Sequence, residues 1–255
     1  MGKFVFILFA MFPFVLFGKE TRKVTIESFN PPYREIFYVL KSDSSIRHGS
    51  YRLISNGKIL VQGYYKTGMK DSLWTQYDEK GKLRFRGFFT EDKRAGIWEF
   101  NDDKGEIEQK VDFTNGQIML YRTQFAGSTF KVFSGQDSIF TLLDRPPLYM
   151  GGASRLKEYI ASEIRPPLHK ANEKALGTVY VECTIDSTGK ISNHHILKGI
   201  GTSCNIEALR VVRALPELWF PGVLNSKNVT VNYVIPVIFD EGLYKNHPSI
   251  VLYGN

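Results

Sequence analysis

The chain has 255 residues, enough for one large domain or for two small ones that each bury a core. Lys and Arg number 33 against 26 Asp and Glu, a formal net charge of +7, and the basic residues are spread along the chain rather than gathered in runs. Such a spread is typical of a solvated surface, so we expect no nucleic-acid binding. The absence of paired carboxylates, a nucleophile elbow or a phosphate-binding glycine loop argues against an enzyme and against a cofactor.

Residues 1–18 differ in kind from the rest of the chain. Lys3 precedes an unbroken apolar run over residues 4–18, which contains Pro13. As a helix this run would span about 22 Å, which is shorter than the roughly 30 Å hydrocarbon core of a bilayer. The segment predicts a secretory signal peptide cleaved at Gly18, and a retained membrane anchor is the alternative. Membrane association is expected only if the anchor is retained.

Two cysteines, Cys183 and Cys204, follow in the exported part of the chain, where a disulfide can form. They could pair, but two independently buried thiols are the preferred interpretation, because nothing in their spacing requires a bridge. Neither resembles a metal site. His194 and His195 are adjacent in an expected strand, so their side chains point to opposite faces and cannot hold one metal ion together.

Residues 19–120 are predicted to form an all-β sheet of hairpin repeats. Gly57, Gly81 and Gly105 are spaced 24 residues apart, and Trp74 and Trp98 keep the same step. Each unit reads as an aromatic-bearing strand, a turn that ends in Gly, and a second strand, which is the order of a β-hairpin. Because one hairpin cannot bury its aromatic face alone, successive units must join into a continuous sheet.

These units resemble the MORN-variant repeat family. The matches are Gly49-Ser50-Tyr51, Gly81-Lys82, Gly87-Phe88-Phe89 and Gly96-Ile97-Trp98, and the third unit departs with Val111 where Gly63 and Gly87 stand. The resemblance implies a sheet used for contacts or spacing, without chemistry of its own. We expect Trp74 and Trp98 to be core, and a glycan- or peptide-binding face that includes both is the alternative.

Residues 121–143 lose the repeat and are interpreted as a connecting segment. Their aromatic residues indicate folded chain and are compatible with one or two further strands of the repeat sheet. Residues 241–255 are interpreted as a tail.

Residues 144–240 predict a two-layer α+β domain with two helices and a three-stranded antiparallel sheet. Leu156, Tyr159 and Ile160 lie at helical spacing after Ser154, a candidate cap, and Pro166-Pro167 forbid continuation. Residues 177–186 and the stretch after the turn at 186–190 alternate as two strands, a second helix ends before Pro216, and residues 228–239 form the last strand. The fold class expected for the chain is therefore α+β.

This order resembles the TonB C-terminal domain family, in the form found in envelope proteins of the Bacteroidetes type. The resemblance covers about 95 residues and rests on the joint order of weak signals. These are Pro147 with Gly151-Gly152, Gly177-x-Val179-x-Val181, Asp186 with Gly189, Glu207-Ala208-Leu209-Arg210, Pro216, Trp219, Pro221-Gly222 and Val231-x-Tyr233-x-Ile235-Pro236-Val237-x-Phe239. Pro166 stands where the family commonly has the Tyr of a Tyr-Pro pair.

The resemblance implies a periplasmic protein that binds an outer-membrane transporter or another envelope protein by strand addition. Pro236 favours an edge position for the last strand, since an edge tolerates a missing N–H group. The candidate partner-binding residues are Arg165, Pro166, Pro167, Thr230, Val231, Asn232, Tyr233 and Val234.

Two functional hypotheses arise from the two halves of the chain. In the first, the C-terminal module binds its partner and passes energy to an outer-membrane transporter, although the chain lacks the Pro-rich span that normally crosses the periplasm. In the second, the repeats bind cell-wall glycan or another envelope component, and the C-terminal module serves for docking or as a homodimer interface.

Overall fold

The structure, a computed structural model, describes residues 19–29, 31–123, 125, 127–135, 137–165, 176–240 and 242. Strands hold 59% and helices 11% of these residues, so the predicted α+β class is wrong and the protein is mostly β. The predicted signal segment 1–18, Pro166, Pro167 and nearly all of the predicted tail lie outside the described residues. None of the described helices is long and apolar enough to span a bilayer.

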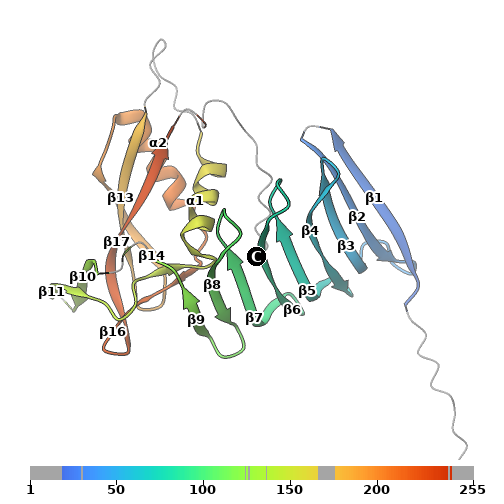
Figure 1. The fold of residues 1–255 in the computed structure, drawn as a ribbon, viewed down its shortest axis with the longest axis horizontal. Coiled ribbons are helices and arrows are strands. Elements are labelled where there is room, and N and C mark those ends of the chain that lie inside the picture. Colours follow the sequence, from blue (N-terminus) through green and yellow to red (C-terminus); the bar gives the residue numbers. More distant parts are fainter. Residues whose placement is uncertain are drawn as a thin grey trace, which may run out of the picture.

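The N-terminal half is one antiparallel sheet of nine strands that pair in chain order, β1 to β9, and curve across the molecule (Figure 1). The strands are β1 (Thr21–Phe29), β2 (Pro32–Leu40), β3 (Arg47–Ser55), β4 (Lys58–Lys66), β5 (Met69–Tyr77), β6 (Leu83–Thr90), β7 (Lys93–Asn101), β8 (Ile107–Asp112) and β9 (Gln117–Tyr121). The predicted hairpins are therefore present.

The turns between β5 and β6 and between β7 and β8 are each fixed by an aspartate and a glycine at the same place in the repeat. Asp78 accepts hydrogen bonds from the backbone N–H groups of Lys80 and Lys82, and Gly81 has a φ of 85°. Asp102 and Gly105, at φ 88°, repeat this arrangement in the next unit. Gly accepts the left-handed conformation without the steric cost of a Cβ atom, which is why the turn glycine recurs.

A second set of glycines makes room for the tryptophans of the following strand. A Cβ atom added to Gly63 would lie 2.2 Å from the ring of Trp74, and one added to Gly87 would lie 2.1 Å from the ring of Trp98. Both indoles are thus packed flat on a glycine backbone. The third unit has no such Trp in β9, and the fully buried Val111 fills the corresponding space itself.

The C-terminal half forms a six-stranded sheet in the order β11-β10-β17-β13-β14, with β16 paired to β17 off this path. Its strands are β10 (Thr129–Ser134), β11 (Asp137–Leu142), β13 (Gly177–Ile185), β14 (Ile191–Lys198), β16 (Gly222–Leu224) and β17 (Lys227–Phe239). The helices α1 (Gly152–Glu163) and α2 (Thr202–Arg213) contribute to its core, and β12 (Leu148–Tyr149) pairs with β15 (Trp219–Phe220).

This sheet has six strands rather than the three predicted. The residues interpreted as a connecting segment fold into the β10-β11 hairpin, which joins β17 instead of the repeat sheet. The aromatic side chains of that segment explain the choice, because Phe125 and Phe130 pack against Tyr233 in the C-terminal core. The start of α1 also differs from the prediction, since α1 begins after Gly151 rather than after Ser154. Neither Gly151 nor Gly201, the N-cap residues of α1 and α2, provides a side-chain cap.

Two buried residues of β8 join the halves at the start of α1. The Glu108 carboxylate, 7% exposed, accepts hydrogen bonds from the backbone N–H groups of Ala153 (2.8 Å) and Ser154 (3.2 Å). The Gln109 side chain accepts from the N–H of Gly151 at 2.7 Å and donates to a backbone oxygen of β12. A helix N-terminus has unpaired N–H groups and partial positive charge, so Glu108 supplies the missing cap from another sheet.

Gly87→Ala is expected to lower the free energy of unfolding by about 1–3 kcal/mol, because the added methyl group overpacks the indole of Trp98. Chemical denaturation measures this change. In the Trp98→Leu background the same substitution should cost much less, since the ring is gone. Equal costs in both backgrounds would show that the glycine has another role.

Glu108→Ala is expected to lower the free energy of unfolding by about 1–3 kcal/mol, since two partly buried N–H groups of α1 lose their acceptor. Glu108→Gln should cost less, because the amide oxygen still accepts a hydrogen bond. The matched control is Glu106→Ala in the same strand region, whose exposed ion pair with Arg122 is worth at most about 1 kcal/mol. A Glu108 cost no greater than this control would contradict the capping role.

Candidate functional site

The last strand, β17, lies inside the sheet and not at its edge as predicted. It pairs with β16 at residues 227–229, with β10 at Thr230 and Val231, and with β13 along residues 231–239. The sequence could not show this, because β10 comes from the segment that had been interpreted as a connection. On the side away from β13, however, no strand of the described chain pairs with residues 232–239.

Pro236 indicates which backbone groups face this open side. It lies opposite Tyr180 of β13, and a proline that faced β13 would remove a hydrogen bond from the ladder. Because alternate residues of a strand direct their N–H and C=O groups to the same side, Asn232, Val234 and Ile238 share the direction of Pro236. The open side therefore presents the backbone groups of these four residues.

The side chains of β17 divide between the core and the outer face. Val231, Tyr233 and the following odd-numbered residues are buried, and burial raises the pKa of the Tyr233 hydroxyl. Asn232 donates to Glu182 at 2.9 Å and Ile238 is 44% exposed on the outer face. Of the predicted partner-binding residues, Val231 and Tyr233 are thus core, Thr230 and Val231 are paired with β10, and Asn232 and Val234 remain at the open side.

Arg165 lies just after α1 and is exposed. It is the last described residue before residue 176. Its backbone N–H donates to Glu207 at 2.6 Å, and this hydrogen bond ties it to α2 rather than to β17. Pro166 and Pro167 lie outside the described residues. Arg165, the one described member of this predicted group, is thus held by α2.

Cys183 and Cys204 are buried thiols that form no disulfide in the structure, so the bridge considered from the sequence is absent between them. The Cys183 thiol donates to the backbone oxygen of Tyr233 at 3.3 Å, inside the sheet. Burial raises its pKa to about 12, and burial also raises the pKa of Cys204. Within the part of the chain that the structure describes, no cluster of side chains could hold a metal ion.

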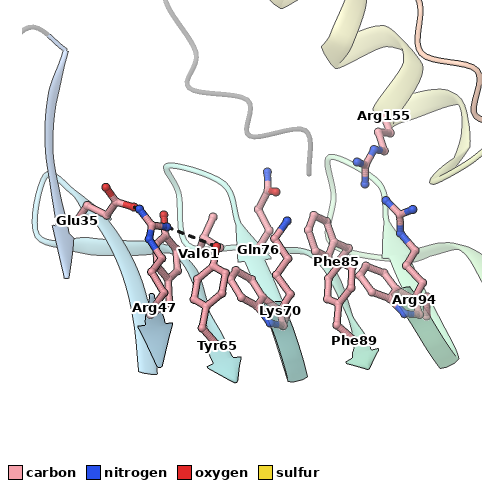
Figure 2. Close-up of a pocket in the computed structure, with 13 residues that line it drawn as sticks. Glu35, Arg47, Val61, Tyr65, Lys70, Gln76, Phe85, Phe89, Arg94 and Arg155 are labelled. Atoms are coloured by element: carbon pink, nitrogen blue, oxygen red, sulfur yellow. Dashed lines mark hydrogen bonds and ion pairs between the residues drawn. The ribbon is translucent and has the colours of Figure 1, made fainter. Parts of the chain in front are cut away.

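The repeat face contains a cavity that sequence reasoning missed. Trp74 and Trp98 are 5% and 1% exposed, so both lie in the core, as the preferred interpretation of the sequence had them. Both indole N–H groups donate to backbone oxygens. Above them lies a cavity of about 260 Å³ whose lining includes Arg47, Lys70, Arg94 and Arg155 (Figure 2). The sequence contains a signal for Arg47, Lys70 and Arg94, because each precedes an aromatic residue of the repeat by four positions.

The structure thus defines a mostly β protein in which one strand, β17, has a side that no described strand pairs. Residues 167–240 match the family described as Gram-negative bacterial TonB protein C-terminal, and this match supports an envelope protein with a TonB-type C-terminal region. The MORN-like assignment of the repeats stays a prediction. No curated protein matches the chain.

Two solved structures of TarM are similar over a limited region. One is described as S. aureus TarM in complex with fondaparinux, alpha-GlcNAc-glycerol and UDP, and the other as TarM. Each is 13% identical at a TM-score of 0.23, with 38% and 39% of this chain covered. The match spans only 20% and 21% of those chains, and a similarity this low carries no argument about fold or function.

Neither cysteine is expected to react with a thiol reagent in the folded protein at mildly alkaline pH, because burial disfavours the reactive thiolate. A colorimetric thiol assay should count no reactive thiol in the native state and two in concentrated guanidinium chloride without reductant. A count of zero in the unfolded chain would show that Cys183 and Cys204 are joined.

Proposed function

We propose that the chain is a periplasmic envelope protein that binds an extended segment of an outer-membrane transporter, or of another envelope protein, as an added strand on β17. The open side of residues 232–239, within the stretch that matches the TonB family, supports this proposal best. An unpaired strand side offers N–H and C=O groups that a further strand completes.

The expected affinity is modest. Asn232, Val234 and Ile238 each offer an N–H and a C=O group, and Pro236 offers a C=O group alone. About seven hydrogen bonds at most, each worth on the order of 1 kcal/mol net, must offset the entropy lost on association. The pairing itself is indifferent to sequence, so selectivity has to come from outward side chains such as Asn232 and Ile238.

Transfer of force to a transporter is the finer part of this proposal. β13 holds β17 along nine residue pairs, and hydrogen bonds of Glu108 and Gln109 fasten the start of α1 to the repeat sheet. The repeat sheet would then serve as the spacer in place of a Pro-rich span. The alternative of glycan stacking on Trp74 and Trp98 is not supported, because their rings are buried.

Val234→Pro is expected to weaken partner binding at least about tenfold while the protein stays folded, because it removes an N–H group from the open side only. Fluorescence anisotropy with synthetic peptides that carry the TonB boxes of outer-membrane transporters measures the affinity. Val234→Ala is the matched control, since it shortens the same side chain and keeps the N–H group, and its affinity should be nearly unchanged.

Tyr233→Pro is the second comparison in this experiment. Its N–H group faces β13 by the same alternation, so this variant should lose the fold rather than only the binding. A folded Val234→Pro variant with unchanged affinity would overturn strand addition at this site.

A further inference from the structure

The first strand of the repeat sheet, β1, has a side that no described strand pairs. β1 pairs with β2 along nine residue pairs and lies at the outer end of the sheet (Figure 1). Sheet edges are usually protected by short strands, bulges, proline or charged side chains. Of these β1 has only charged side chains, since it is nine residues long, contains no proline and pairs without a register shift. At the other end of the sheet, β9 has five residues and a register shift against β8.

The hydrogen bonds between β1 and β2 indicate which backbone groups of β1 face outward. The N–H group of Lys41 donates to the backbone oxygen of Glu20 at 2.9 Å, so residue 20 directs its backbone groups toward the second strand. Alternate residues of a strand share this direction. Phe29, which lies opposite Pro32 and its missing N–H group, accordingly falls among the residues that face away. The outward backbone groups are those of Thr21, Lys23, Thr25, Glu27 and Phe29.

The sequence of β1 is complementary to itself when two copies run antiparallel. In the register centred on Thr25, Lys23 lies opposite Glu27 of the second copy, and two-fold symmetry forms this pair twice. Moving the centre by one residue removes both ion pairs. Moving it by two places either Lys23 or Glu27 opposite its own copy. Opposite charges in facing positions stabilise a strand pair and like charges destabilise it, so the register centred on Thr25 is favoured.

The same register covers apolar side chains that are exposed in a single copy. Ile26 is 43% exposed, and Val24, on the same face of the strand, packs against the aromatic core. In a pair centred on Thr25, Ile26 lies opposite Val24 of the second copy, at a position without hydrogen bonds where side chains approach closely. Phe29, which is 86% exposed, comes to lie opposite Thr21. Pairing would therefore cover apolar surface as well as complete the backbone hydrogen bonds.

We propose that two copies of this chain associate through their β1 strands, antiparallel and centred on Thr25, so that the two repeat sheets continue into one. A second copy is favoured over another partner because the charges and apolar residues of β1 match those of β1 itself. A contact of one strand pair is small beside the interfaces of permanent dimers, so we expect a dimer that dissociates on dilution. This inference goes beyond the proposed strand addition, since it concerns the repeat sheet and leaves β17 open.

Sedimentation velocity of the purified full chain, over an about hundredfold range of concentration, tests the proposal. The parent should shift from monomer toward dimer as the concentration rises. Thr25→Pro removes an outward N–H group and leaves the bonds to β2 in place, so it should raise the dimer dissociation constant at least about tenfold. Thr25→Ala is the matched control, because it shortens the same side chain and keeps the N–H group. Its dissociation constant should lie within about threefold of the parent's.

Charge reversal at low salt tests the register. Lys23→Glu and Glu27→Lys each place like charges opposite one another, so either variant alone should dimerise about tenfold more weakly. An equimolar mixture of the two variants places opposite charges at both positions, and it should recover dimers of nearly the parent's affinity. Arg22→Glu is the matched control, since it reverses a charge of the same strand that faces Ser28 of the second copy, and it should change the affinity little.

Three outcomes would overturn the proposal. The first is a parent chain that stays monomeric over the whole concentration range. The second is a Thr25→Pro variant that keeps its fold by circular dichroism and dimerises like the parent, since the interface would then lie elsewhere. The third is a mixture of the charge variants that dimerises no better than either alone. Val234→Pro should dimerise like the parent, so failure here is distinguished from failure of strand addition on β17.

Discussion

The buried hydrogen bonds between β8 and the start of α1 are the contact on which the arrangement of this protein depends. Glu108 caps the helix across the boundary between the sheets, and Gln109 bonds to the backbone of Tyr149 and of Gly151. A carboxylate buried this deeply is tolerated because it meets N–H groups at the positive end of a helix. The same contact brings Arg155 over the aromatic face, so one residue of the cavity lining comes from the other half of the protein.

The close approach of the two halves also explains a glycine pair. Gly151 and Gly152 have φ values of 94° and 87°, which a side chain would strain. A Cβ atom on Gly152 would in addition lie 2.5 Å from the Glu108 carboxyl carbon. Both the backbone conformation and the space at the cap therefore require glycine. The Gly151-Gly152 pair, which is part of the family resemblance, is thus explained by local geometry.

Two faces of the protein differ in the groups that they present. On the unpaired side of β17 these groups belong to the backbone, so the proposed recognition there depends on extension of the partner more than on its side chains. Over the repeat sheet, the cationic ends of Arg47, Lys70 and Arg94 lie on aromatic rings.

The sequence by itself determined the hairpin repeats, the alternation of β17 and the resemblance of residues 144–240 to a family, because these depend on neighbours in the chain. The step of 24 residues sets the turns at Gly81 and Gly105 without reference to the rest of the molecule. Tertiary structure decided the features that depend on contacts between distant residues. The pairing of β10 with β17, which moved the last strand from the edge to the interior, depends on aromatic packing over about 100 residues of separation. The position of Arg155 of α1 near Arg94 of β7 also depends on contacts between distant residues. No local sequence pattern places a helix over a particular strand.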